Sequence, residues 1–159
     1  IGYSYDGADA SFELLARRAM NEIPRYISIK EYDVTVKKDK NGKIISSAKA
    51  HLEVDKQVIL CEGEGNGPVH ALDNAIRENV DKLSKYSQYL KDLKLVDYKV
   101  RILNTGTEAV TRVSIESTDS NGKNWFTIGV SANIIDASFK ALIDSLDYKL
   151  FKDNAPASL

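Results

Sequence analysis

The side chains of this sequence that could do chemistry are few, and they form no catalytic constellation. The two histidines, His51 and His70, fall on the polar side of a predicted strand and in the first turn of a predicted helix. Cys61 lies within a predicted strand, where a cysteine is most simply a small apolar residue. We therefore expect no catalytic residue and no metal site in this chain.

One glycine-rich stretch superficially resembles a phosphate-binding loop. It runs Gly-Glu-Gly-Asn-Gly-Pro from Gly63 to Pro68. The stretch lacks the Gly-Lys-Ser/Thr ending of such loops, and Pro68 stands where a backbone amide would serve. The acidic residues near the start, Asp6, Asp9 and Glu13, fit a capped and solvated helix start better than a metal site.

Two helix starts remain as candidates for binding a small molecule. One lies at Ser131 to Asp136, and the other at Pro68 to His70. The free amides and the positive dipole end of a helix N-terminus suit a carboxylate. The start at Ser131 to Asp136 retains all its backbone amides and is the better candidate. The alternative is simple capping, in which Ser131 or Asn133 satisfies the helix end and nothing binds.

The two helix starts belong to a duplicated unit. Gly63 and Gly129 lie 66 positions apart in the sequence, and so do Ala71 and Ala137. The same offset aligns an upstream strand, which runs Glu-Tyr-Asp-Val-Thr-Val from Glu31 and Asp-Tyr-Lys-Val-Arg-Ile from Asp97. An offset shared by a strand start and a helix start indicates an internal repeat.

Hydrophobic periodicity and turn residues predict the elements of each unit. A first helix over 8–23 has an apolar stripe of Phe12, Leu15, Ala19 and Ile23. The first unit has strands over 29–38, 44–54 and 57–64 and a helix from Pro68 to about Ser84. A polar linker over 85–92 precedes strands over 95–103, 108–118 and 124–130 and a helix over 133–146. We expect the tail from Asp153 to be frayed.

The expected fold class is α+β, with two pseudo-symmetric βββα units preceded by an N-terminal linker helix. The expected organisation is a linker segment over 1–28, a regulatory domain over 29–152 and a tail over 153–159. Within that domain, the first unit spans 29–84 and the second spans 93–150. One amphipathic helix can cover one face of three antiparallel strands, and two such units can bury what each leaves exposed.

Composition narrows the class of protein. The chain has 159 residues and a net charge of −1, so no electrostatic footprint for nucleic acid is present. The single cysteine excludes an intramolecular disulfide and favours a reducing compartment. No apolar run approaches the roughly 20 residues that span a membrane. We expect a cytoplasmic protein without nucleic-acid or membrane partners and, because it starts at Ile1, a piece of a longer protein.

Several motifs resemble a known family. The segment from Gly129 to Leu146, which begins Gly-Val-Ser-Ala-Asn-Ile-Ile-Asp-Ala, resembles the signature of the C-terminal regulatory domain of 2-isopropylmalate and citramalate synthases. Leu-Val-Asp-Tyr-Lys-Val-Arg from Leu95, and Gly-Glu-Gly-Asn-Gly-Pro-Val-His-Ala from Gly63, resemble two further family motifs. The segment from Gly2 to Leu15 is similar to the helical subdomain of the citramalate synthase branch, which we therefore favour.

The resemblance implies a homodimer that binds a feedback amino acid at its interface. The parent enzyme would condense acetyl-CoA with a 2-oxo acid, pyruvate for citramalate synthase, on a catalytic barrel that needs a divalent metal. This chain would lack the barrel, catalyse nothing and need no cofactor. The effector would be a branched-chain amino acid, with isoleucine expected for the citramalate branch. Its binding would act on the barrel through the linker helix.

The resemblance also implies a set of effector-binding residues. They lie on one strand of the second unit, on the next strand and at the two helix starts: Leu95, Tyr98, Ile102, Thr107, Thr111, Val69, His70, Ala132 and Ile134. His70 departs from the family, in which an acidic or small residue often stands, so no residue is assigned to the effector's ammonium group. For Leu95, Tyr98 and Ile102, ordinary sheet core is the alternative.

Three alternatives to this function stay open. The domain could sense leucine for a 2-isopropylmalate synthase, since a pocket separates such similar side chains by only about 1–3 kcal/mol. It could be a dimerisation module without effector binding. An RNA-binding module also uses βββα units, but the near-neutral charge disfavours it.

Overall fold

The computed structural model describes residues 9–105 and 108–159, and it confirms the α+β fold with two βββα units behind an N-terminal helix. The first part of the chain forms α1 (Asp9–Ala19), β1 (Ser28–Lys38), β2 (Ile44–Val54), β3 (Gln57–Gly65) and α2 (Pro68–Arg77). Two 3-10 turns (Val80–Lys82 and Ser84–Tyr86) and α3 (Ser87–Leu90) follow. The second unit comprises β4 (Lys94–Thr105), β5 (Glu108–Thr118), β6 (Asn124–Ser131) and α4 (Ile134–Lys152).

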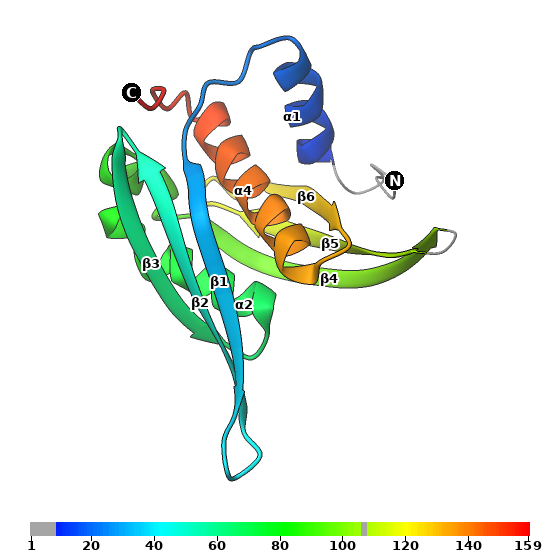
Figure 1. The fold of residues 1–159 in the computed structure, drawn as a ribbon. Helices are drawn as coiled ribbons and strands as arrows, with labels where there is room; N and C mark the ends of the chain where they lie inside the picture. The colour runs from blue at the N-terminus through cyan, green and yellow to red at the C-terminus, as the bar shows by residue number, and fades with distance from the viewer. Residues whose placement is uncertain (1–8, 106–107) are drawn as a thin grey trace.

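Each unit forms its own antiparallel sheet. The strand orders are β1-β2-β3 and β4-β5-β6, so β1 and β4 are edge strands in equivalent positions. Each of these strands has a register shift near its start, between Ile29 and Glu31 in β1 and between Leu95 and Asp97 in β4. The repeat of 66 residues therefore extends to the irregularities of the backbone. The β1–β2 hairpin and the β4–β5 hairpin reach well beyond the helices (Figure 1).

Glycines let each helix lie close to its own sheet. A Cβ at Gly63 would overlap the backbone of Ala75, and a Cβ at Gly129 would overlap the backbone of Ala137 and Ala141. These contacts are equivalent in the two units, and they explain why glycine and alanine recur at the same offset. A side chain at either glycine would force helix and sheet apart.

A single hydrophobic core joins the two units. It contains Leu52 and Leu72 from the first unit and Ile115 and Phe139 from the second. Helix α2 lies on β2 and β3, α4 lies on β5 and β6, and the two helices contact each other. Phe139 of α4 also packs against Tyr32 of β1, with ring centroids 4.0 Å apart.

The helix predicted to reach Ser84 ends at Arg77, which corrects that expectation. Apolar residues continue at helical spacing through Val80 and Leu83. The helix nevertheless ends earlier, because the side chain of Asn79 bonds to backbone carbonyls that precede it in the sequence. Its side-chain amide donates to Ala75 O at 2.7 Å and to Glu62 O at 2.9 Å. The predicted linker over 85–92 is also partly helical, since it contains a 3-10 turn and α3.

The predicted apolar stripe of α1 does not face the core. The side that faces the domain carries Ala10, Ser11 and Leu14, which are buried, whereas Phe12 and Leu15 are 54% and 53% exposed. The hydroxyl of Ser11 accepts a bond from Ile128 N at 2.9 Å and donates to Asp144 at 3.1 Å. A small polar side chain thus lets α1 lie against the edge of β6.

The C-terminal tail packs against the first unit, contrary to the expectation of fraying. Ala155 is buried, and Ser158 N donates to Arg25 O at 2.8 Å. Asp55 N donates to the Ser158 hydroxyl at 2.8 Å, and the Tyr86 hydroxyl donates to Pro156 O at 2.7 Å. The tail therefore connects the end of the second unit to loops of the first.

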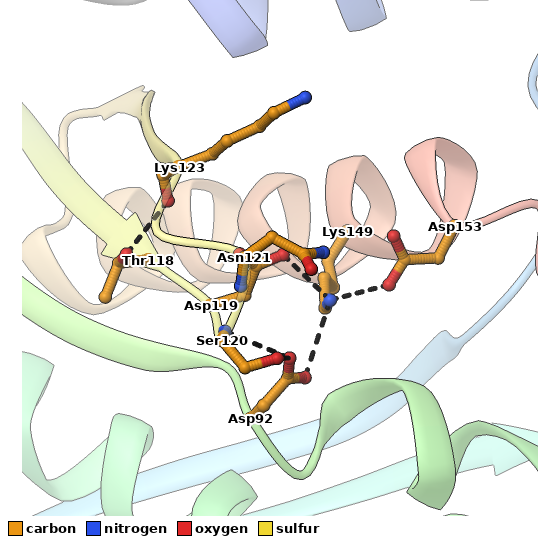
Figure 2. A network of polar contacts seen from close by, with 8 residues as sticks. All are labelled: Asp92, Thr118, Asp119, Ser120, Asn121, Lys123, Lys149 and Asp153. Atoms are coloured by element: carbon orange, nitrogen blue, oxygen red, sulfur yellow. Dashed lines mark hydrogen bonds and ion pairs between the residues drawn. The ribbon is translucent and has the colours of Figure 1, made fainter.

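A buried lysine holds the C-terminal end of α4 in place. Lys149 is 3% exposed, and its ammonium lies 2.9 Å from Asp119, 2.6 Å from Asp153 and 3.4 Å from Asp92. Figure 2 shows the three carboxylates converging on Lys149 from the β5–β6 turn, the C-terminus of α4 and the segment before β4. Burial opposes the charge of Lys149, but the hydrogen bonds and charges of these carboxylates outweigh it and raise its pKa.

Candidate functional site

The inner face of β4 is the most prominent apolar surface among the predicted effector residues. Tyr98 and Ile102 are directly opposite Ile115 and Thr111 of β5, with Val100 between them. Paired residues on neighbouring strands point to the same face of a sheet, so these side chains share the face of the buried Ile115. Tyr98 is nevertheless 40% exposed and Ile102 72% exposed.

The exposure of β4 follows from how the helix covers the sheet. Helix α4 lies on β5 and β6, and β4 makes its extensive contacts with β5 alone. The equivalent strand β1 differs, because Phe139 of α4 covers Tyr32. Tyr32 and Tyr98 occupy the same position of the repeat, yet only Tyr32 lies under an aromatic ring from α4.

Strand pairing brings part of the predicted set into one row. Ile102 lies opposite Thr111, and Thr111 lies opposite Ser131, which immediately precedes the exposed Ala132. The row leads from the edge strand to the start of α4, where Ile134 is half-buried. Thr107, the remaining predicted strand residue, lies outside the described residues.

The start of α4 is capped by its own side chains. The Asn133 side chain accepts from Ile135 N at 2.8 Å and from Asp136 N at 3.2 Å, and the Ser131 hydroxyl accepts from Asn133 N at 3.1 Å. The capping alternative is therefore observed here. Three backbone amides of the stretch from Ser131 to Asp136 therefore already have a side-chain partner.

The start of α2 has a different arrangement. Pro68 opens the helix, and the N-cap residue Gly67 makes no side-chain capping bond. Asn66 N donates to Nδ1 of His70 at 3.3 Å, which holds the imidazole over the loop. Val69 is buried in the core, whereas His70 is half-buried. Of the two helix starts, that of α2 therefore has fewer side-chain partners for its backbone amides.

A small internal cavity lies between α2, α4 and the second sheet. Its volume is about 20 Å³, which is room for one water molecule. Leu95 lines it together with Ser117 and with Asp73 and Arg77, which form an ion pair. The cavity is too small for an amino acid, so the predicted residues do not enclose a complete pocket within one chain.

Asp73 is a charged residue near this surface that sequence reasoning missed. It lies three positions after His70 on α2, which places the two on the same side of the helix. Burial raises the pKa of Asp73, and the charge of Arg77 offsets part of that rise. The available signal was an Asp and an Arg spaced i,i+4 on a helix whose other residues are mostly apolar.

The described part of the chain contains neither a metal-binding cluster nor a membrane-spanning helix. Residues 9–105 and 108–159 contain no cluster of three or more histidine, cysteine or acidic side chains arranged to hold a metal ion. Within the same ranges, no helix combines the length and apolar character needed to cross a membrane.

The sequence matches a family described as the LeuA allosteric (dimerisation) domain over residues 6–150. A (R)-citramalate synthase of Geobacter sulfurreducens is 45% identical over 154 residues, and one of Aquifex aeolicus is 43% identical over 155. These alignments cover 95% and 96% of this chain but only 28% and 29% of those proteins. A 2-isopropylmalate synthase of Clostridium acetobutylicum is 32% identical over 135 residues, covering 83% of this chain and 22% of that protein.

Proposed function

The chain belongs to the family of LeuA allosteric (dimerisation) domains, and on that premise we propose that it is the feedback-sensing domain of a citramalate synthase that binds isoleucine between two copies of the chain. The similarity to (R)-citramalate synthases along almost the whole chain supports the choice of parent enzyme. The whole enzyme would join acetyl-CoA to pyruvate on a metal-dependent barrel outside this sequence.

One observation carries the proposal: the inner face of β4 is apolar and is not covered by the helix of its own unit. Tyr98, Val100 and Ile102 continue the buried surface of β5 into solvent. Contiguous apolar surface of this kind marks interaction sites in soluble proteins. A second copy placed against this strand would bury these side chains and close a pocket for the effector.

The charged groups near β4 supply the polar contacts that an amino acid needs. The Asp73 carboxylate, which is paired with Arg77 and lines the same internal cavity as Leu95, would hold the effector's ammonium, which the sequence alone left without a ligand. The start of α2, with no side-chain cap, would hold the effector's carboxylate through backbone amides. The apolar row of Tyr98 and Ile102 would take the branched side chain.

Leucine sensing is the principal alternative, supported by the similarity to a 2-isopropylmalate synthase. The two effectors differ by the position of one methyl group, so the expected preference is about 10- to 200-fold. Dimerisation without effector binding is the other alternative, and it predicts a stable dimer that no amino acid stabilises.

The test combines titration calorimetry with light scattering. We expect isoleucine to bind the chain more tightly than leucine or valine, and the chain to be dimeric. Ile102→Asp should dissociate the dimer and abolish binding, because it places a charge where an isoleucine is to be buried. The lost burial alone, about 1.5–3 kcal/mol, corresponds to a roughly 10- to 100-fold weaker dimer.

Lys99→Asp is the matched control, since Lys99 lies on β4 opposite Ser114 and points to the other face of the sheet. It should leave the dimer and the affinity close to those of the native chain. The proposal is wrong if no branched-chain amino acid gives heat, or if both aspartate variants behave alike.

A further inference from the structure

A groove that is lined by no residue of β4 lies alongside α4. It occupies about 1050 Å³ between α1, β1, β6 and α4, a size that suits a small ligand. Figure 1 shows α4 with β1 on one side and α1 on the other. All of its walls come from one chain, so the groove does not depend on a partner.

The α4 side of the groove carries two opposite charges next to each other. Lys140 Nζ lies 3.2 Å from Asp136 Oδ2, one turn apart on α4, and Tyr32 donates its hydroxyl to Asp136 Oδ1 at 3.2 Å. Burial alone would raise the pKa of Asp136, but bonds from Ser131, Lys140 and Tyr32 lower it. A carboxylate and an ammonium held next to each other complement the ammonium and carboxylate of a free amino acid.

The rest of the groove is lined by apolar side chains and, around them, by the polar and charged side chains of Ser11, Arg18, Lys30, Glu31 and Asp144. Ile29 and Tyr32 contribute from β1, Phe139 and Ile143 from α4, and Leu15 from α1. Leu15 belongs to the apolar stripe of α1 that does not reach the core, and its side chain lines the groove instead. A pocket with apolar walls and a few convergent polar groups is typical of small-molecule sites.

The internal repeat relates this groove to the proposed effector surface. At an offset of 66 residues, Ile29 and Tyr32 correspond to Leu95 and Tyr98, and Asp136 corresponds to His70. The acidic residue that is missing at His70 is therefore present at the equivalent position of the other unit. A binding site in the groove needs only the residues and charges that line the groove. It therefore does not depend on the proposed effector site.

We propose that this groove is a second site for a free amino acid with an apolar side chain. The ligand's ammonium is held by Asp136 and the Tyr32 hydroxyl, and its carboxylate by Lys140. Its side chain lies between Ile29, Phe139 and Ile143. One chain then carries two amino-acid sites, one completed by a partner and one completed by the chain itself.

The test is a titration of the isotope-labelled 159-residue chain with isoleucine, leucine, valine and phenylalanine, followed by amide NMR shifts. We expect shifts at residues 29–32 and 136–143 with at least one of these amino acids. Asp136→Asn and Lys140→Gln should each weaken that binding at least tenfold. Asp33→Asn, on the outward face of β1 and opposite Lys49, should leave it unchanged.

The possible results separate this proposal from the proposed effector function. Shifts at both the groove and residues 95–102 support both sites, and shifts at the groove alone support this proposal while removing the β4 site. Shifts only at residues 95–102 overturn the groove and leave the effector function intact. Shifts at neither place overturn both, and unchanged affinity in the two groove variants also overturns the groove.

Discussion

Lys149 shows how one residue can fix the relative position of several elements. Its three carboxylate partners lie on different segments, and the side chain of Asp119 is itself only 7% exposed. Removing one partner of a buried ion pair leaves an uncompensated charge, which costs far more than the pair contributes. The cluster therefore makes the chain sensitive to any change at Lys149.

Lys149→Met should lower the free energy of unfolding by about 3–5 kcal/mol, because it leaves Asp119 buried without its cation. The measurement is urea unfolding followed by circular dichroism. Lys152→Met is the control, since Lys152 also ends α4 but pairs with Glu13 at a solvent-exposed site. That change should cost less than about 1 kcal/mol. Equal losses in the two variants would show that the buried cluster has no special role.

At the scale of elements, α1 is fastened to α4 by a small charged cluster. Arg18 of α1 donates to Asp144 at 2.9 Å and to Asp147 at 2.8 Å. Burial raises the pKa of Asp147 to about 7, and Arg18 only partly opposes this. Its Oδ1 atom is buried and has no hydrogen-bond partner among the residues that the structure describes. The contact between the helices therefore depends on protonation.

The pH dependence of this contact has a definite sign. The pKa of Asp147 is higher in the folded chain than its ordinary value of 3.8. The folded state thus holds an extra proton between about pH 4 and 7, and the stability contributed by Asp147 is lost as pH rises through that window. Asp147→Asn should gain stability relative to the native chain over this range, by at most about 1.4 kcal/mol per pH unit.

Chemical denaturation at pH 4, 5.5, 7 and 8 measures this difference. Below pH 4 the two chains should be about equally stable, and above pH 7 their difference should be constant. A difference that does not vary with pH would show that the pKa of Asp147 is the same in the folded and the unfolded chain, and that Arg18 balances the effect of burial.

The sequence predicts the strands well because each one carries its own local signal. Alternation and the turn residues Asn41-Gly42 and Asn121-Gly122 place β2 and β5 at the bounds the structure has. The end of α2 could not be predicted in this way. It depends on a bond from Asn79 to Glu62 O, which lies 17 positions away in the sequence.

Which side of α1 packs against the domain could also not be predicted without the structure. Apolar periodicity identifies the stripe of a helix but does not identify what covers it, and α1 meets β6 through Ser11 instead. For the candidate site, strand register could be expected to gather Ile102 and Thr111, because hairpin pairing follows from the turn. The capping of α4 by Asn133 was one of two alternatives that only the geometry separated.

At the scale of the whole molecule, the tail links the two units through hydrogen bonds to Arg25, Asp55 and Tyr86. Burial raises the pKa of Tyr86 to about 12, so its hydroxyl remains a neutral donor to Pro156 O at any ordinary pH. These contacts add to the shared core in making the two units a single folding unit.

Deletion of residues 156–159 should lower the free energy of unfolding by about 1–3 kcal/mol. The tail contributes a few hydrogen bonds worth roughly 0.5–1.5 kcal/mol each, and the ordering of its backbone offsets part of them. Thermal and urea unfolding measure the loss. Tyr86→Phe, which removes one hydroxyl bond, should cost about 1 kcal/mol. An unchanged unfolding midpoint in the deletion variant would show that the tail only rests on the surface.

The equivalent register shifts in β1 and β4 have an evolutionary consequence. The shared offset and the equivalent register shifts indicate a duplicated unit, in which each ancestral position has two descendants, such as His70 and Asp136. The two descendants mutate independently, so one half of the chain can change its surface while the other half retains its own. Relatives of this chain can therefore differ from one another by substitutions in one half, without rebuilding the backbone that both halves share.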